Sequence, residues 1–289
     1  MLFPNNFLEI SEKYQFFIFD IWGVLHDGTE QYPNVLSTFE HLKKNNKRVC
    51  LLSNAPRRSH KAEEVLRKFN INSDMYEFIL TSGEATYQYL LKNQQDDYVE
   101  YGKNYLYIGP DKDLDLLDGL DYRITSDETK ANFVLVTGFD NEDSTIDEKM
   151  ADINKAISAN LPMICVNPDM IVVKKTGKSQ LCAGHIAKKY KELGGEVVYF
   201  GKPYEAVYDK VFELFSITSS DSGKVLAIGD GLETDIKGAN QNKIKSVFVT
   251  SGIISAILGS KYSQLPDKEQ LKHQFKLNDG FPDYVIPNL

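Results

Sequence analysis

The sequence predicts an α/β fold, in which a core domain built on a mostly parallel sheet carries a smaller inserted α/β domain. Short apolar runs alternate with amphipathic segments along most of the 289 residues, and strands that alternate with helices form parallel sheets. The chain is also longer than one hydrophobic core usually allows. Finally, the interval between residues 53 and 202 holds strands and helices of its own, as an inserted domain would.

The expected strands are short runs of apolar, β-branched and aromatic residues. They lie at 16–19, 48–52, 104–108, 133–136, 196–200, 224–228 and 245–249. The amphipathic segments between them predict helices near 34–46, 57–69, 83–92, 145–159, 179–193, 204–215 and 233–242. We assign residues 1–85 and 186–289 to the core domain and residues 86–185 to the inserted domain, with the polar stretch 93–103 as a linker.

The charge balance argues against a nucleic-acid partner. Asp and Glu number 41 against 33 Lys and Arg, for a net charge of -8, and no segment concentrates basic residues as a nucleic-acid footprint would. Such a protein repels an anionic substrate, so a phosphorylated ligand would need a local positive site, which a bound metal ion would supply.

The same composition predicts a cytoplasmic protein without a membrane partner. No run of about 18 apolar residues occurs, and residues 1–14 lack the basic and apolar regions of a signal peptide. The three cysteines, Cys50, Cys165 and Cys182, have no paired spacing, which is typical of reduced, buried thiols.

Polar side chains follow four of the predicted strands directly. In parallel sheets, ligands bind at these carboxyl ends, and we expect the four ends to meet at one edge of a sheet. The residues concerned are Asp20, Ser53 with Asn54, Lys202, and Asp230.

Asp20 occupies the place of a nucleophile, at a strand end before a tight turn, although a lone aspartate there more often caps the turn. Asp230 and Asp235 offer the oxygen ligands that Mg²⁺ prefers. We expect Asp230 to bind the metal directly, while Asp235 either binds it too or holds a water or a lysine. The alternative for this pair is capping of a helix N-terminus.

Lys202, Ser53 and Asn54 complete a site for a phosphoryl group. A cation at Lys202 would neutralise the group in transfer and restrain the carboxylates. Ser53 and Asn54 offer a hydroxyl group and main-chain N–H groups at a helix N-terminus, where anions bind; simple capping is the alternative.

Together these segments resemble the haloacid dehalogenase superfamily, whose members carry a nucleophilic Asp, a Ser or Thr, a Lys and an acidic pair in this order. The segments similar to its NagD-like branch, subclass IIA, are DIWGVL, LLSNAP, LTSGEATYQYLL, VNPD and GGEVVYFGKP. The resemblance covers nearly the whole chain. It implies a Rossmann-like core with an α/β cap inserted between the second and third motifs.

The resemblance also implies a mechanism. Asp20 would attack phosphorus to form an aspartyl-phosphate, Mg²⁺ and Lys202 would stabilise the charge, and water would hydrolyse the intermediate. The metal would be bound by Asp20, the main-chain carbonyl of Trp22, and Asp230.

Trp22 departs from the pattern of the family, whose phosphatases place a second Asp two residues after the nucleophile as general acid and base. An indole ring performs neither role, and general acid/base catalysis is typically worth about 10² to 10⁴ in rate. We therefore expect poor turnover of alkyl phosphates unless another group substitutes. His26 and Asp27 are the nearby candidates, although a solvent-exposed histidine and a turn aspartate are the plainer interpretations.

The expected function is that of a Mg²⁺-dependent phosphatase acting on a small phosphorylated metabolite, with Asn167 of the VNPD segment contacting the substrate or merely forming a turn. Two alternatives stay open. The protein is either a weakly catalytic binder of phosphometabolites or a hydrolase for substrates with good leaving groups. A homodimer also stays open, and the sequence does not identify the substrate.

Overall fold

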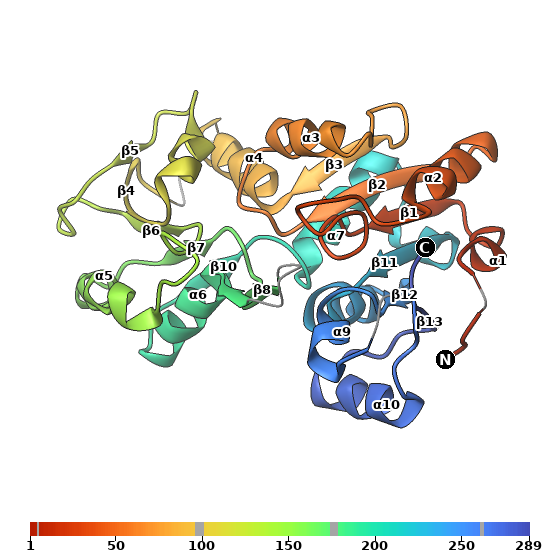
Figure 1. Cartoon of the computed structure of the whole chain (residues 1–289). Coiled ribbons are helices and arrows are strands. Elements are labelled where there is room, and N and C mark those ends of the chain that lie inside the picture. Colours follow the sequence, from red (N-terminus) through yellow and green to blue (C-terminus); the bar gives the residue numbers. More distant parts are fainter. Residues whose placement is uncertain (5, 96–100, 174–178, 261–262) are drawn as a thin grey trace.

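Two parallel sheets organise the chain in the computed structural model, which describes residues 1–4, 6–95, 101–173, 179–260 and 263–289. The first sheet has the order β13-β12-β11-β1-β2-β3, and its neighbouring strands are all parallel. Its strands are β1 (Phe16–Phe19), β2 (Arg48–Ser53), β3 (Phe78–Thr81), β11 (Val225–Gly229), β12 (Lys245–Val249) and β13 (Tyr284–Ile286). Figure 1 shows this sheet on the right and the second group of strands on the left.

The first sheet is covered on both faces, which is why its strands are continuous apolar runs. Side chains of β1 alternate between the faces: Phe17 and Phe19 pack with residues of α2 (Val35–Lys44) and α3 (Ser59–Lys68). Phe16 and Ile18 pack on the other face, with residues of α7 (Glu205–Phe215). The core of this unit therefore lies on both sides of β1.

The second sheet has the order β10-β7-β6-β4-β5 and is also parallel. Its strands are β4 (Asn104–Ile108), β5 (Arg123–Ile124), β6 (Phe133–Val136), β7 (Met163–Cys165) and β10 (Val197–Tyr199). Helices α5 (Ile146–Ser158) and α6 (Ala183–Glu192) pack on one face, and α4 (Ser82–Gln95) contributes Leu90 to the cluster on the other. The predicted α/β fold class, with parallel sheets, is confirmed.

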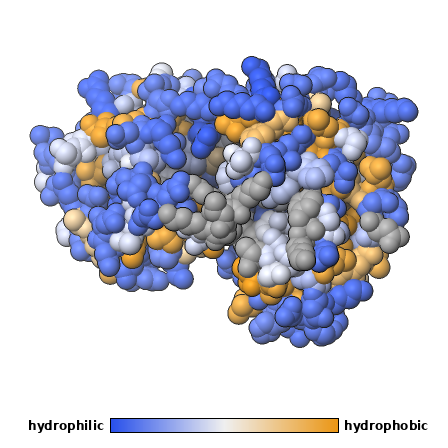
Figure 2. All heavy atoms as spheres, viewed as in Figure 1, coloured by the Kyte–Doolittle hydropathy of each residue, from blue (hydrophilic) through white to orange (hydrophobic). Residues whose placement is uncertain are grey.

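The remaining elements are short or lie at the ends of the chain. They are α1 (Leu8–Ser11), η1 (Asp111–Leu117), β8 (Ile171–Val173), β9 (Ser179–Leu181), η2 (Ser219–Lys224), η3 (Leu232–Ile236), α8 (Lys237–Gln241), α9 (Ile253–Leu258) and α10 (Lys268–Leu277). The N-terminus of α10 is capped by Asp267, whose carboxylate accepts hydrogen bonds from the N–H groups of Glu269 and Gln270. In the part of the chain that the structure describes, no helix has the length and apolar character needed to cross a bilayer. Figure 2 shows hydrophilic side chains predominating over both units on one face.

Three expectations about elements need correction. The strand predicted at 196–200 is β10, but it pairs with β7 in the second sheet, so only three of the four strand ends share one sheet edge. The helix predicted at 179–193 begins only at Ala183, because residues 179–181 pair antiparallel with β8. The linker predicted at 93–103 overlaps α4 at its start, and residues 96–100 lie outside the described residues.

The division into a core and an inserted domain stays a prediction, with its second boundary moved. A boundary at residue 185 would fall inside α6, and β10 extends the second sheet to Tyr199. We therefore propose that the inserted unit ends near residue 200, where the chain returns to the first sheet through α7.

Candidate active site

Asp20 lies at the carboxyl end of β1, and its N–H donates a hydrogen bond to the carbonyl of Ile228 on β11 (2.8 Å). The carboxylate is buried, with the residue 8% exposed. Gly23, three residues on, has a φ of +83°, and a Cβ there would clash with the carboxylate of Asp230. The two loops therefore approach so closely that only glycine fits.

Asp230 and Asp235 both reach this position from the end of β11. Asp235 lies in the π-helical turn η3, and its Oδ2 accepts a hydrogen bond from the N–H of Gly231 (3.1 Å). Both side chains are buried. Carboxylate oxygens of Asp20, Asp230 and Asp235 lie within 4.8 Å of one another, so the structure brings the three predicted acidic residues together.

Lys202 neutralises part of this cluster, although it follows the second sheet. Its Nζ donates to Oδ1 of Asp20 (2.5 Å), to Oδ1 of Asp235 (2.7 Å) and to the carbonyl of Leu52 (3.0 Å). Burial by itself would lower the pKa of Lys202, but the two carboxylates raise it above its usual value, so the ammonium stays charged. Lys202 is thereby tied to both β1 and β11.

The charges in the cluster do not balance. Burial raises the pKa of Asp20 well above its usual value, with Lys202 lowering it and the carboxylates of Asp235 and Asp230 raising it. When all three carboxylates are ionised, the single ammonium leaves two negative charges uncompensated. A divalent cation held by oxygen ligands would compensate them. The donor set therefore fits a metal ion, with Asp20, Asp230 and Asp235 as the residues that could hold it.

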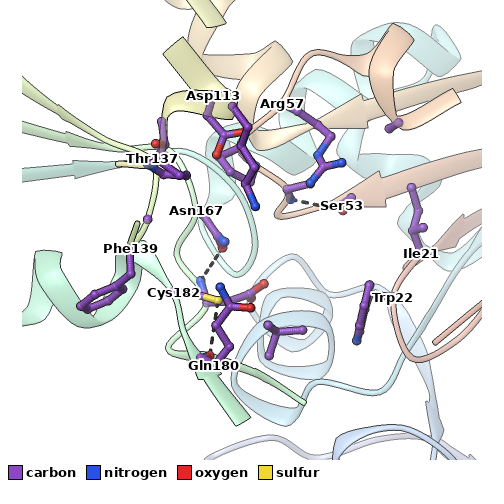
Figure 3. A pocket seen from close by; sticks show the side chains of 18 of the residues that line it. Ile21, Trp22, Ser53, Arg57, Asp113, Thr137, Phe139, Asn167, Gln180 and Cys182 are labelled. Atoms are coloured by element: carbon purple, nitrogen blue, oxygen red, sulfur yellow. Dashed lines mark hydrogen bonds between the residues drawn. The ribbon is translucent and has the colours of Figure 1, made fainter. Parts of the chain in front are cut away.

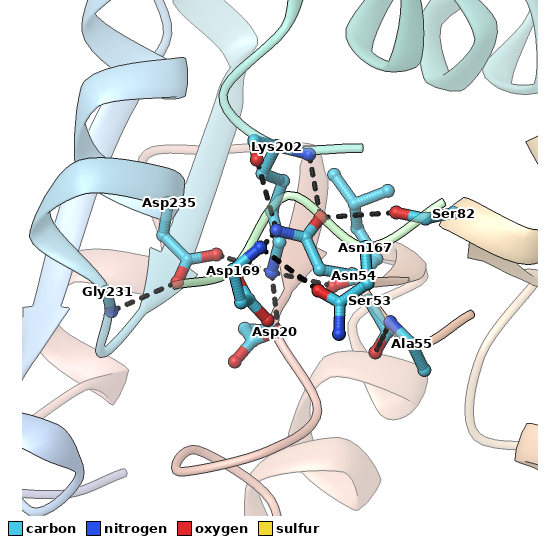
Figure 4. Close-up of polar contacts among 11 residues, drawn as sticks. Asp20, Ser53, Asn54, Ala55, Ser82, Asn167, Asp169, Lys202, Gly231 and Asp235 are labelled. Atoms are coloured by element: carbon cyan, nitrogen blue, oxygen red, sulfur yellow. Dashed lines mark hydrogen bonds and ion pairs between the residues drawn. The ribbon is translucent and has the colours of Figure 1, made fainter. Parts of the chain in front are cut away.

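Asn54 links three segments beside the cluster (Figure 4). Its Oδ1 accepts from the N–H of Lys202 (2.7 Å) and from Oγ of Ser82 (3.3 Å). Its Nδ2 donates to the carbonyl of Lys202 (3.0 Å) and to Oδ1 of Asp169 (2.8 Å). Ser53 precedes it at the end of β2, and its Oγ accepts from the N–H of Ala55 (3.2 Å).

A cavity of about 350 Å³ lies between the two units beside the cluster. Residues of the first unit that line it include Trp22, Ser53 and Arg57, and residues of the second include Asn167 and Asp169. Figure 3 shows Trp22 and Ser53 on one wall and Asn167 on the other. Ser53 and Asn167, which were predicted to bind substrate, thus face the same space.

Trp22 lines the cavity as an apolar wall. The indole packs edge to face with the imidazole of His26, with 5.6 Å between the ring centroids. Gly28 has a φ of +87°, and a Cβ at this position would clash with the indole. The ring therefore sits in a closely fitted turn, two residues after Asp20.

Neither neighbouring candidate for the missing acid is well suited to that role. We expected His26 to be exposed to solvent, but it is buried. Burial lowers its pKa to about 4, so the imidazole is neutral. Its Nδ1 accepts from the N–H of Gly28 (3.0 Å). Asp27 accepts hydrogen bonds from the N–H groups of Thr29 and Glu30 (both 2.8 Å), the contacts of a turn aspartate.

Two residues of the cavity were not predicted as site residues. Asp169 stands two positions after Asn167, in the same VNPD segment, and that proximity was the signal available. Arg57 follows Ser53 and Asn54 closely, and its buried Nε has no hydrogen-bond partner among the described residues. Its neighbour Arg58 forms an ion pair with Glu84 (2.7 Å). Sequence alone does not distinguish these adjacent arginines.

Comparison with known proteins assigns both parts of the chain to one family. Residues 17–123 match the model of haloacid dehalogenase-like hydrolases, and residues 199–289 match a second model of the same group, described as HAD-hydrolase-like. An acid sugar phosphatase from Staphylococcus epidermidis is 24% identical over 262 residues, which cover 89% of this chain and 92% of the relative.

Solved structures share the fold over almost the full length. A haloacid dehalogenase-like hydrolase from Brucella suis 1330 superposes with a TM-score of 0.81 at 24% identity, covering 99% of each chain. A p-nitrophenyl phosphatase from Archaeoglobus fulgidus has a TM-score of 0.72 at 21% identity, covering 96% of this chain and 97% of its own. The chain therefore belongs to the haloacid dehalogenase-like hydrolases, and its architecture is that of their NagD-like members.

Proposed function

We propose that the protein is a Mg²⁺-dependent phosphatase that hydrolyses a small phosphorylated metabolite through an aspartyl-phosphate on Asp20. The observation that carries the proposal is the buried carboxylate of Asp20, bound by Lys202 at 2.5 Å and grouped with two further carboxylates. Residues that directly follow Asp20, together with Ser53, line a cavity of about 350 Å³, which is the size of a site for a small metabolite.

In the proposed reaction, an oxygen of Asp20 attacks phosphorus, the bond to the leaving oxygen breaks, and water then hydrolyses the acyl phosphate. The hydroxyl group of Ser53 and the segment that begins at Asn54 bind the phosphoryl oxygens. Lys202 offsets negative charge on Asp20 and on the transferred group. Mg²⁺, when bound to Asp20, Asp230 and Asp235, would supply further compensation of charge. The main-chain carbonyl of Trp22 as an additional ligand stays a prediction.

The relatives support a phosphorylated substrate. The curated relative from Staphylococcus epidermidis is an acid sugar phosphatase, and the structural neighbour from Archaeoglobus fulgidus hydrolyses p-nitrophenyl phosphate according to its name. We infer a small phosphate ester, with a sugar phosphate as the first class to test. The buried free thiols of Cys50, Cys165 and Cys182 support a reducing, cytoplasmic setting, and a homodimer stays open.

Trp22 supports a second candidate, a phosphometabolite-binding protein with weak turnover. By the family resemblance of the sequence, the indole takes the place of the expected acid, and it donates no proton to a leaving group. Slow hydrolysis of alkyl phosphates would then accompany retained binding.

A hydrolysis screen separates these functions. The purified protein is assayed with p-nitrophenyl phosphate, an acyl phosphate and several sugar phosphates, with Mg²⁺ and with EDTA, and the Asp20→Asn variant serves as the control. Metal-dependent release of phosphate by the wild type alone supports the phosphatase. Saturable binding without turnover of any ester would establish the second candidate instead.

A further inference from the structure

Asp169 is the one carboxylate from the second unit that is connected to the nucleophile by hydrogen bonds within the described residues. It follows β7 and lines the cavity. Its Oδ1 accepts from Nδ2 of Asn54 (2.8 Å), and the same amide holds both main-chain groups of Lys202. Since Nζ of Lys202 binds Asp20, three contacts lead from Asp169 to the attacking carboxylate (Figure 4).

The two oxygens of Asp169 differ in their partners. Oδ1 accepts from Asn54, whereas no hydrogen bond to Oδ2 occurs among the described residues. Asp169 also lines the cavity. One oxygen of a cavity-lining carboxyl group is therefore fixed by Asn54, and the other keeps its capacity to bond a ligand.

The pKa of the Asp169 carboxyl group lies above its ordinary value. Burial raises its pKa, Lys202 and the hydrogen bond from Asn54 lower it, and Asp235 raises it, with a net upward shift. The other titratable neighbours, Cys165 and Cys182, have thiol pKa values raised by burial, so they stay neutral. Such an environment is typical of a catalytic carboxylic acid.

The other groups on the cavity wall fit the role less well. Trp22 does not exchange protons, His26 is a neutral imidazole, and Asp27 is bound in its turn. Asp113 also lines the cavity, and burial raises its pKa too. Its charged neighbours, however, are Lys112, Arg57, Lys61 and Asp115 rather than residues bound to Asp20.

We propose that Asp169 is the general acid and base of this enzyme, supplied by the inserted unit in place of the acid that Trp22 displaces. The proposal rests on the phosphatase function proposed above. As Asp20 forms its bond to phosphorus, the phosphorus–oxygen bond to the leaving group breaks, and the proton of the Asp169 carboxyl group passes to the departing oxygen. The Asp169 carboxylate then takes a proton from the water that attacks the aspartyl-phosphate, which restores the acid and releases inorganic phosphate.

The test compares leaving groups. Asp169→Asn keeps an oxygen that accepts from Asn54 but has no acidic proton. We expect its kcat/KM for glucose 6-phosphate, an alkyl ester, to fall by about 10² to 10⁴. Its kcat/KM for p-nitrophenyl phosphate should stay near the wild-type value, because the leaving group departs as an anion when Asp20 is phosphorylated and needs no proton. The p-nitrophenyl phosphate activity of the variant also shows that its site is folded.

Asp113→Asn is the matched control, since it removes another buried carboxyl group of the same cavity. It should change kcat/KM for the two esters in equal proportion. A wild-type pH profile gives a measurement that needs no variant: kcat/KM for the alkyl ester should decline at alkaline pH, as Asp169 loses its proton, and that for the aryl ester should lack this decline.

Each outcome is informative. Equal losses for both esters in Asp169→Asn, or matching alkaline profiles in the wild type, would overturn the assignment of Asp169 and leave the phosphatase standing. Wild-type activity on the aryl ester alone would also overturn it, because no acid would then operate. Absence of activity on every ester, in contrast, would overturn the proposed function itself.

Discussion

The ammonium of Lys202 lies 2.5 Å from Oδ1 of Asp20, although the two residues follow strands of different sheets. Asp20 ends β1 of the first sheet, and Lys202 stands just after β10 of the second. The cation bound to Asp20 is thus supplied by the segment that leads from the second sheet back to the first. The carboxylate and the ammonium are both buried, which strengthens their interaction.

Asp20→Asn should abolish hydrolysis of every phosphate ester and leave the protein folded. The substitution removes the nucleophilic oxygen and one negative charge with almost no change of volume. Phosphate release and far-UV circular dichroism measure the two effects. Turnover by the folded variant would disprove the assignment of the nucleophile.

Mg²⁺ should raise the melting temperature of the wild type, because a ligand that binds only the folded state stabilises it by mass action. Asp230→Ala should remove this shift, since it deletes one of the three grouped carboxylates. Differential scanning fluorimetry over a series of Mg²⁺ concentrations, with Asp267→Ala as a control at a distant helix cap, tests the prediction. A full response in Asp230→Ala would move the metal site elsewhere.

Arg57→Gln should raise KM for the metabolite more than it lowers kcat. Within the described residues, the buried Nε of Arg57 has no hydrogen-bond partner, and the side chain lines the cavity. A substrate oxygen would therefore complete its hydrogen bonds. Arg58→Gln should instead lower the melting temperature, since Arg58 pairs with Glu84 and its guanidinium lies over the ring of Tyr87. An unchanged KM in Arg57→Gln would exclude that contact.

The stability of the protein should fall between about pH 6.5 and pH 4 partly because of His26. Its pKa is lowered from 6.5 to about 4 by burial, so the unfolded chain binds a proton in this range while the folded protein does not. The stabilisation is therefore full above pH 6.5 and is lost as the pH falls toward 4, by roughly 3 kcal/mol for this shift. Urea unfolding at several pH values should show a flatter dependence in His26→Gln than in the wild type. Parallel curves for the two proteins would contradict the role of this imidazole.

Trp22→Asp should restore hydrolysis of alkyl phosphates to the Asp169→Asn variant, since it returns an acid to the position two residues after Asp20. If protonation of the leaving group limits the rate, the wild type should hydrolyse aryl or acyl esters faster than alkyl esters. This difference in rate should become smaller in the single variant Trp22→Asp. The gain is at most about 10² to 10⁴. A cavity left beside Gly28 and a new buried charge would offset part of it. A folded, Mg²⁺-binding double variant without any gain would show that position 22 is not within reach of the leaving oxygen.

The sequence predicted those strands and helices whose pattern of apolar residues is visible within a short segment of the chain. The strands that became β1, β2, β11 and β12 are apolar runs buried on both faces. The polar residues at their carboxyl ends, Asp20, Ser53 and Asp230, were recognisable for that reason. The short strands β3, β7 and β13 were missed. Each has only three or four residues. An apolar run of this length is equally compatible with a segment of buried helix. Length alone does not separate them from β1 and β6, which have four residues each and were predicted.

Long-range relationships were beyond the sequence. Nothing in residues 196–200 indicates that the strand pairs with β7 rather than with β1, because strand partners are selected by the packing of whole sheets. The contact between Asn54 and Asp169, 115 positions apart, has the same origin. The sequence therefore indicated the VNPD segment as a candidate for substrate contact, but not the hydrogen bond that joins Asp169 to Asn54.

The side-chain amide of Asn54 matches the hydrogen-bonding character of each of its neighbours. Its nitrogen faces two acceptors, the carbonyl of Lys202 and the carboxylate of Asp169, and its oxygen faces two donors, the N–H of Lys202 and the hydroxyl of Ser82. Aspartate would place an oxygen opposite two acceptors, which repel it. Leucine would leave four polar groups without a hydrogen-bond partner, and glutamine is longer by one methylene group. Asparagine matches all four contacts, so a replacement at position 54 should loosen the connection between Lys202, Ser82 and Asp169.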